Sequence, residues 1–164
     1  MILYFYKLAF ITAIFFLTAS LGVEGNFIHS IVSYNIKFDD GSQSKNSWKN
    51  RKDGMIKLIN SLSPDIVGTQ EGLIHQIKFL DVNLNKLTYV GVGREDGNKK
   101  GEFCAIFFNK YKYNLLDAST FWLSNTPEKV STGWDAALER ICTYALLETI
   151  EGKDKIWVFN TLSL

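Results

Sequence analysis

The chain has 164 residues, a formal net charge of +1, 46% apolar residues and 14% aromatic residues. This composition is typical of one globular domain, and with two prolines and twelve glycines it excludes a low-complexity chain. The near-neutral charge excludes a general attraction to nucleic acid or anionic membranes, so any site for a polyanion has to be local.

The first 25 residues differ in composition from the rest of the chain. Lys7 is the only charged residue before Glu24, and residues 8–23 are almost wholly apolar. A basic N-terminal region, an apolar central region and small residues before the expected cleavage site predict a signal peptide over residues 1–25. The chain from residue 26 is then expected to be secreted or extracytoplasmic. An uncleaved membrane anchor is the alternative, because the apolar run approaches the length of a membrane span.

Strands and helices alternate in the next part of the chain. Residues 28–36 alternate in polarity and are rich in β-branched side chains, which predicts a strand. Residues 47–61 predict a helix that is capped by its first serine and ended by the Ser-Pro pair shortly after it. Residues 65–69 predict a short buried strand, and residues 73–85 carry apolar side chains at helical spacing.

Strands dominate the rest of the chain. After a charged loop at residues 94–100, the sequence predicts strands over residues 102–109, 113–123, 141–150 and 155–160. The order strand, helix, strand, helix and then several strands predicts an α/β or α+β layered fold built on β-sheet, with its helices early.

The two cysteines and the two histidines have ordinary interpretations. Cys104 and Cys142 both lie in predicted strands. We expect them to be buried thiols. The alternative is a disulfide between them, which could form if the chain is exported to an oxidising compartment. His29 and His75 are expected to be surface residues.

Two of the tryptophans stand in loops or at strand ends where a ligand could reach them. Trp122 ends a predicted strand and Trp134 follows a glycine. We expect both to pack in the core or at its rim, and stacking on a nucleic-acid base is the alternative.

Polar residues stand where two of the predicted strands end. Asn35 ends the first strand and Glu71 follows the second, and in open α/β sheets ligands collect at this edge. A carboxylate beside a neutral amide suits Mg²⁺, which takes one or two carboxylates and keeps several waters. The alternative is structural: Asn35 terminates a strand, and Glu71 lies in a first helical turn, where the helix dipole favours its charge.

Five segments of the chain, taken in order, resemble one known family. They are SYNI, WKNRKDGMIKLINSLSPDIVGTQEG, VGREDGNKKGEFCAIFFNKYKYNLLDASTFWLSNTPE, GWDAALERICTYALL and WVFNT, within residues 30–161. The series resembles the endonuclease/exonuclease/phosphatase superfamily. This resemblance implies a two-sheet α/β sandwich with a divalent-metal site at one edge and hydrolysis of phosphate esters.

The resemblance also implies roles for single residues. Asn35 and Glu71 match the first two active-site positions, with Glu71 as the ligand of Mg²⁺ or Mn²⁺ and Asn35 as a phosphate-binding group. Arg140 matches an arginine that faces the substrate phosphate, for which its planar fork of donors is suited. Taken alone, Arg140 has an alternative, an ion pair with Glu139 or Asp135.

Two further positions follow from the resemblance. Glu102 matches an acidic residue that orients a catalytic histidine, and Asn160 matches the asparagine of a segment that continues with histidine, leucine, aspartate and histidine. Leu162 stands where the first of those histidines is expected. Because this and later motifs are lacking, we expect residues 26–164 to be the N-terminal part of a truncated domain, unstable or inactive alone.

The expected function is that of a divalent-metal-dependent phosphoester hydrolase. The resemblance leaves open a nucleic acid, a phospholipid, an inositol phosphate or a small phosphodiester as the substrate, and it implies no protein partner. A catalytically dead remnant that at most binds is the alternative. A third possibility is an enzyme tethered to a membrane by residues 1–23.

Overall fold

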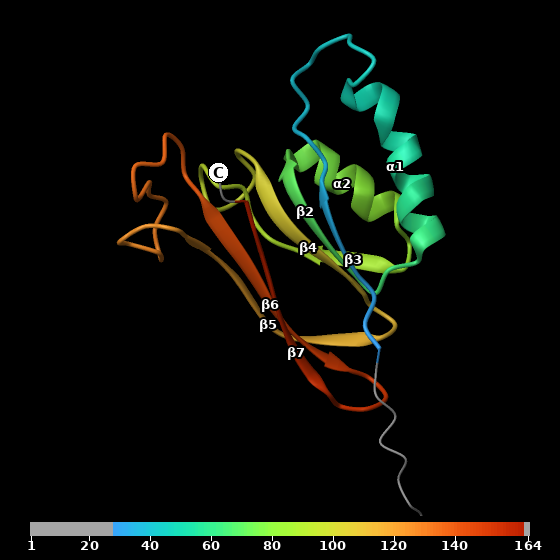
Figure 1. The fold of residues 1–164 in the computed structure, drawn as a ribbon. Coiled ribbons are helices and arrows are strands. Elements are labelled where there is room, and N and C mark those ends of the chain that lie inside the picture. The colour runs from blue at the N-terminus through green and yellow to red at the C-terminus, as the bar shows by residue number, and fades with distance from the viewer. Residues whose placement is uncertain (1–27, 163–164) are drawn as a thin grey trace, which may run out of the picture.

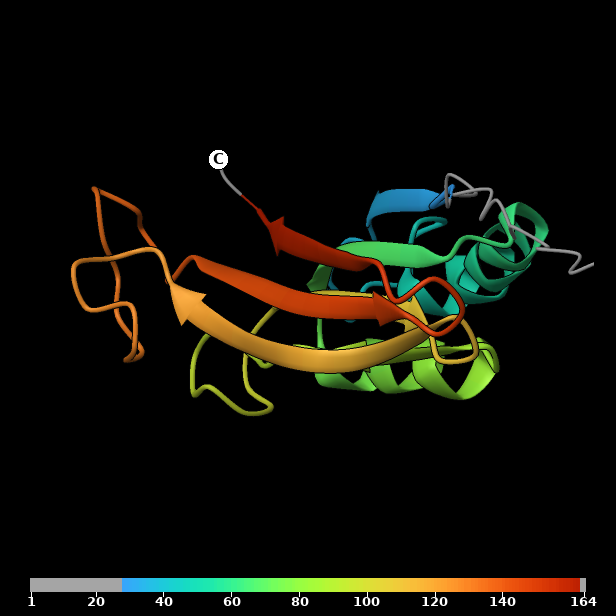
Figure 2. The same cartoon turned by 90° about the horizontal axis from the view of Figure 1, so that it is seen from below.

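The computed structural model describes residues 28–162, which form seven strands and two helices (Figure 1). Two sheets pack face to face, and the helices cover the outside of one of them (Figure 2). The predicted two-sheet α/β sandwich is therefore confirmed. The predicted signal segment, residues 1–25, lies outside the described residues, and within those residues no helix has the length and apolarity needed to cross a membrane.

Sheet A holds the first four strands in the order β1-β2-β4-β3. Its strands are β1 (Ile31–Asn35), β2 (Ile66–Gly72), β3 (Leu87–Val90) and β4 (Phe103–Asn109). β1 and β2 are parallel, which the crossover through α1 (Trp48–Leu62) makes possible, and β4 runs antiparallel to both of its neighbours. The carboxyl ends of β1 and β2 and the start of β4 therefore lie at one edge.

The helices α1 and α2 (Ile74–Asn83) cover the face of sheet A that points away from sheet B (Figure 1). Ser47 occupies the N-cap position of α1 as predicted, but its side chain makes no capping hydrogen bond. At the other end Ser63 adopts a left-handed conformation (φ 44°), and its N–H donates to the carbonyls of Ile59 and Asn60. This cap ends the helix directly before Pro64.

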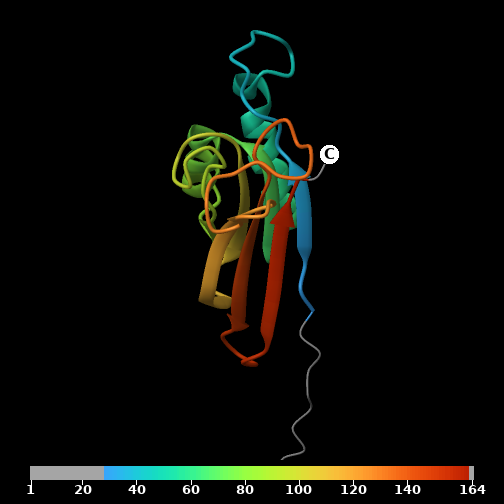
Figure 3. The same ribbon diagram turned by 90° about the vertical axis from the view of Figure 1, so that its left-hand side faces the viewer.

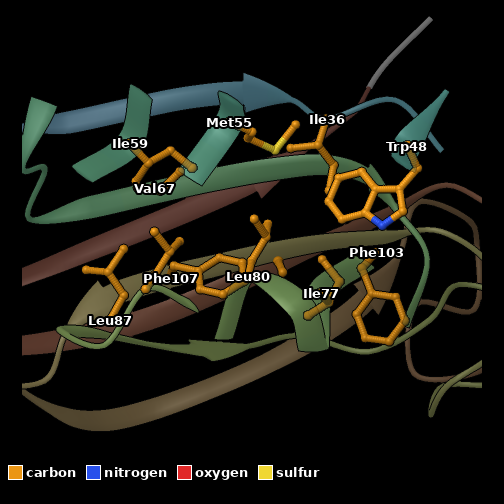
Figure 4. Close-up of a cluster of buried hydrophobic side chains, with 12 residues drawn as sticks. Ile36, Trp48, Met55, Ile59, Val67, Ile77, Leu80, Leu87, Phe103 and Phe107 are labelled. Atoms are coloured by element: carbon orange, nitrogen blue, oxygen red, sulfur yellow. The ribbon is translucent and has the colours of Figure 1, made fainter. Parts of the chain in front are cut away.

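The main core lies between the two helices and sheet A (Figure 4). β4 is buried on both faces, because Phe103, Ala105 and Phe107 point to the helices and the residues between them point to sheet B. Each large apolar side chain buried in this way contributes roughly 1.5–3 kcal/mol. β4 therefore fixes how the layers stack.

Sheet B contains the last three strands, all antiparallel, in the order β5-β6-β7 (Figure 3). They are β5 (Tyr113–Trp122), β6 (Ile141–Thr149) and β7 (Lys155–Thr161). Its inner face packs on sheet A through a second core that includes Ile106, Ala145 and Leu147.

The opposite face of sheet B, which we call the outer face, carries a row of aromatic rings. Tyr144 contacts Phe121, Trp157 and Phe159, with ring centroids 5.7–6.5 Å apart. Trp157 and Phe159 are 52% and 60% exposed. Within the described part of the chain, no helix covers this face as α1 and α2 cover sheet A.

The sequence predicts every element except β3, which was not predicted as a strand, and one boundary differs with a consequence for the site. β2 runs through Gly72, three residues beyond the predicted strand, so Glu71 belongs to the strand and not to a first helical turn. The helix-dipole interpretation of Glu71 is therefore wrong. Cys104 and Cys142 are free and buried as expected, and burial raises the pKa of the Cys104 thiol to about 12.

Candidate active site

Three of the predicted site residues meet at the edge of sheet A where β1 and β2 end. Glu71 is the second-last residue of β2, Glu102 precedes β4 and Arg140 precedes β6. All three line one shallow depression, together with Arg94 and Glu139. Asn35 joins them through a hydrogen bond to Glu71, whereas Asn160 does not line the depression.

A bulge in β2 sets the position of Glu71. Thr69 lies opposite Ala105 and Gly72 lies opposite Phe103, so two residues of β2 face the single residue Cys104. Glu71 takes a left-handed backbone conformation (φ 62°), which is uncommon for a residue with a side chain. Bulges of this kind redirect a side chain, and such backbone strain, roughly 1–3 kcal/mol, gathers at functional sites.

Asn35 holds the redirected carboxylate. Its Nδ2 donates a hydrogen bond to Glu71 Oε1 at 2.7 Å, and its Oδ1 accepts one from the backbone N–H of Lys37 at 2.9 Å. The second contact fixes which end of the amide faces Glu71. Asn35 therefore fixes one carboxylate oxygen of Glu71 and leaves the other for a ligand.

Glu102 is held by an arginine and not by a histidine. Arg94 Nη1 lies 3.0 Å from Glu102 Oε2, and Arg94 Nη2 donates to Glu102 Oε1 at 3.3 Å. The two side chains are only 10% and 20% exposed, so this two-point ion pair is shielded from water. Nε of Arg94 is buried without a hydrogen-bond partner among the described residues.

The two histidines lie outside the depression. His75 Nε2 is 2.9 Å from Asp39 Oδ2, and His29 Nδ1 is 2.7 Å from the hydroxyl of Tyr113. Neither therefore supplies a partner for Glu102. His75 is exposed, as expected for a surface residue, whereas His29 is partly buried against Tyr113.

Arg140 lines the depression and forms no direct ion pair with the carboxylates there. None of the ion pairs among the described residues includes Arg140, so the alternative of a pair with Glu139 or Asp135 is not observed. Its backbone carbonyl accepts a hydrogen bond from Leu123 N–H at 2.7 Å, which fixes the start of β6. The backbone at Arg140 is therefore fixed, and its guanidinium has no ion-pair partner among the described residues that an anion would have to displace.

Asn160 lies beneath the site and connects the two sheets. Its Nδ2 donates to the carbonyls of Thr69 and Ala105, both at 2.9 Å, and its Oδ1 accepts from Gln70 Nε2 at 2.7 Å. All of these groups are buried. Asn160 therefore supports the strand that carries Glu71, and it reaches the depression only through its neighbours.

The donor set fits a divalent cation that prefers oxygen. Within the described residues no three His, Cys, Asp or Glu side chains form a metal cluster, so a cage made only of protein ligands is not present there. Mg²⁺ needs no such cage, because it binds through one or two carboxylates and completes its shell with waters and substrate oxygens. Glu71, oriented by Asn35, provides that carboxylate.

A second hollow of about 380 Å³ adjoins the depression and shares Arg140 with it. Trp134 and Asp135 line this hollow, and Trp134 is 70% exposed, so it does not pack in the core. Trp122 does pack as expected: it is buried, and its Nε1 donates to the carbonyl of Arg94 at 2.8 Å.

Sequence reasoning missed Arg94, although a signal for it exists. Arg94 and Glu102 carry opposite charges and flank a loop rich in glycine, and Gly93 pairs with Phe103 across it. A hairpin-like closure of that loop brings the two charges together. The bulge at Glu71 has no comparable signal in the sequence.

Several solved structures share this fold. An endonuclease/exonuclease/phosphatase from Bacteroides vulgatus is 37% identical over 80% of this chain and 50% of its own, with a TM-score of 0.76. A mannosyl-6-phosphatase from Bacteroides thetaiotaomicron is 36% identical over 80% of this chain and 50% of its own, with a TM-score of 0.77. ANGEL2, a 2',3'-cyclic phosphatase, is 20% identical over 83% of this chain and 41% of its own (TM-score 0.65) and shows the fold alone.

The chain thus spans about half the length of the solved structures it matches. Comparison with protein-family models finds no match, and comparison with curated proteins finds none.

Proposed function

We propose that this chain, which has the endonuclease/exonuclease/phosphatase fold, provides the metal-binding and phosphate-binding part of a phosphoester hydrolase. The observation that carries the proposal is the bulged, left-handed Glu71, held by Asn35 and lining the same depression as Arg140. A strained carboxylate in the same depression as an arginine that forms no direct ion pair suits a cation and an anion bound next to each other.

Glu71 would hold the cation, Mg²⁺ or Mn²⁺, through the carboxylate oxygen that Asn35 leaves open. When bound, such a cation supplies Lewis-acid polarisation of a phosphate oxygen. Asn35 keeps the carboxylate in place, and Asn160 supports the same strand from below through Gln70.

Arg140 would bind the substrate phosphate. Its guanidinium presents parallel N–H donors that match two phosphate oxygens, and no ion pair among the described residues competes for it. Arg94 keeps Glu102 in its own ion pair. This neutralises one carboxylate of the depression, so that Glu102 adds little repulsion toward an anion.

The substrate is a phosphate ester whose organic part remains to be assigned. The solved structures that this chain resembles include a mannosyl-6-phosphatase at 36% identity, which supports the reaction class more than a substrate. The net charge of +1 argues against tight binding to duplex DNA. Mannose 6-phosphate and bis(p-nitrophenyl) phosphate are therefore suitable first substrates.

A binding module without turnover is the second candidate. Neither histidine lines the depression, and a positioned acid or base typically contributes about 10²- to 10⁴-fold to the rate. For the 164-residue chain we therefore expect binding of cation and phosphate, but no hydrolysis above a control with metal alone. Hydrolysis above that control would favour a complete enzyme.

Titration with Mn²⁺, followed by electron paramagnetic resonance, tests the metal site directly. We expect Glu71→Gln to lower the affinity for Mn²⁺ at least about tenfold, because a neutral amide replaces the carboxylate proposed to hold the cation. Glu128→Gln, at an exposed loop position, is the matched control and should leave the affinity unchanged. Equal affinities of the wild type and Glu71→Gln would remove Glu71 from the proposed metal site.

A further inference from the structure

We propose that the hollow beside Arg140 binds the sugar ring of a sugar phosphate, with Trp134 as its platform and Asp135 as an acceptor for its hydroxyl groups. This inference rests on the proposed function, because it takes Arg140 as the phosphate-binding group. It adds a substrate class and two specificity-determining residues.

Arg140 connects the two parts of the site. It lines the depression that contains Glu71, and it also lines the hollow that contains Trp134 and Asp135. A phosphate bound at Arg140 would therefore place its esterified group in the hollow. The volume of about 380 Å³ suits a small ring rather than a polymer.

Trp134 is exposed and yet held in place. The loop that carries it is tied by a hydrogen bond between the hydroxyls of Ser124 and Ser131 (2.6 Å), and Gly133 packs so closely that a Cβ there would lie 2.6 Å from Ser124 Cα. Trp134 and Asp135 both have left-handed backbones, with φ of 51° and 60°. Two consecutive strained residues that present a 70% exposed indole are typical of a ligand contact.

Asp135 determines the orientation and the class of the ligand. Asp135 lines the hollow, is exposed, and takes part in none of the ion pairs among the described residues. A carboxylate repels phosphate but accepts hydrogen bonds from hydroxyls, so the charges place the phosphate at Arg140 and the hydroxyls at Asp135. An aromatic face beside such an acceptor matches a sugar, which has one apolar face and a hydroxylated edge.

The test compares ligands that differ in one part, by isothermal titration calorimetry of the 164-residue chain with Mg²⁺. The ligands are glucose 6-phosphate, glycerol 3-phosphate, methyl glucoside and adenosine 5'-monophosphate. We expect glucose 6-phosphate to bind about tenfold more tightly than glycerol 3-phosphate, because only the former has a ring. Trp134→Ala should abolish that difference without changing the affinity for glycerol 3-phosphate.

Two variants control for the fold. Trp157→Ala removes an exposed tryptophan of the outer face and should change neither affinity. Asp135→Asn should weaken glucose 6-phosphate severalfold and should not weaken glycerol 3-phosphate. A loss of affinity for both ligands in Trp134→Ala, or equal affinities of the two in the wild type, overturns the proposal.

The remaining outcomes separate this inference from the proposed function. Trp134-dependent binding of adenosine 5'-monophosphate more tightly than glucose 6-phosphate would overturn the sugar in favour of a base. Trp134-dependent binding of methyl glucoside, with no effect of Arg140→Ala on any phosphate ligand, would keep the ring subsite and overturn the phosphate site. Absence of detectable binding by glucose 6-phosphate overturns the inference itself.

Discussion

Asp65 is a buried residue whose ionised carboxylate stabilises the fold. Burial alone would raise the pKa of the Asp65 carboxyl, but hydrogen bonds from Lys112 and Ser30 outweigh burial and hold the pKa below its usual value of 3.8. Lys112 follows β4 and Ser30 precedes β1, so this carboxylate ties together the two segments that flank the start of β2. The charged form is therefore the form that the native state favours.

The depressed pKa predicts a loss of stability in acid that depends on Asp65. Above about pH 4 the carboxylate is ionised in both states and stabilises the fold fully, and this contribution is lost as the pH falls through the lower, native pKa. Asp65→Asn should lower the free energy of unfolding by about 1–3 kcal/mol at pH 7, and by less at pH 2–3. Urea unfolding at both pH values measures the difference.

Asp117→Asn is the control for that experiment, because Asp117 is exposed on β5. Its free energy of unfolding should differ from that of the wild type by at most a few tenths of a kcal/mol at either pH. An equal effect of Asp65→Asn at both pH values would show that the ionisation of Asp65 does not stabilise the fold.

The candidate site was predicted from the sequence only in part. Asn35, Glu71 and Arg140 were identified through the family resemblance, and the structure brings them together. The contact between Arg94 and Glu102 was not identified, because it depends on how a loop closes on itself. The conformation of Glu71 was also missed, since a bulge arises from the register of two strands and leaves no mark in one strand alone.

At the scale of elements, β2 shows how closely the two sheets approach. Gly68 lies at the centre of β2, and a Cβ added there would lie 3.0 Å from Oδ1 of Asn160 on β7. The sequence predicted β2, as a short buried strand, and β7 as separate strands. It could not predict that they meet, because 90 residues separate the hydrogen-bonded side chains of Gln70 and Asn160.

The close contact between Gly68 and Asn160 predicts that alanine destabilises the fold at Gly68, whereas alanine at Gly54 should stabilise it. Gly68→Ala should destabilise the fold by about 1–3 kcal/mol, because the methyl group displaces a buried asparagine that makes three hydrogen bonds. Gly54→Ala, within α1 with no atom within 4 Å of the added Cβ, should stabilise it by about 0.5–1 kcal/mol. Urea midpoints measure both, and a Gly68→Ala chain as stable as the wild type would refute the close approach.

At the scale of the whole molecule, the two sheets differ in how their faces are covered. Sheet A is covered on one face by helices and on the other by sheet B, whereas the outer face of sheet B exposes Trp157 and Phe159. The order of elements predicted a layered fold built on β-sheet, the family resemblance implied a two-sheet sandwich, and the structure confirms both. Which face stays open could not be predicted, because alternation along a strand shows that one side is apolar but not what covers it.

The outer face predicts self-association that can be reduced by substitution. Exposed contiguous apolar surface favours contact between molecules. The double variant Trp157→Thr and Phe159→Thr should sediment as a smaller species than the wild type and bind less of the dye ANS, with an unchanged circular dichroism spectrum. Val82→Thr, which removes one isolated exposed apolar residue on α2, should change neither property.

Unchanged sedimentation and unchanged ANS binding in the double variant would show that the outer face does not mediate contacts. A changed circular dichroism spectrum would instead indicate that the two aromatic side chains support sheet B from outside.

The contacts of Asn160 also set an order of events during synthesis of the chain. A ribosome makes Thr69 and Ala105 long before Asn160, which follows them by 91 and 55 positions. Until Asn160 leaves the exit tunnel, the carbonyls of Thr69 and Ala105 and the amide of Gln70 lack the partner that the native state gives them. The strand carrying Glu71 therefore gains its final support late, after every strand of sheet A has been synthesised.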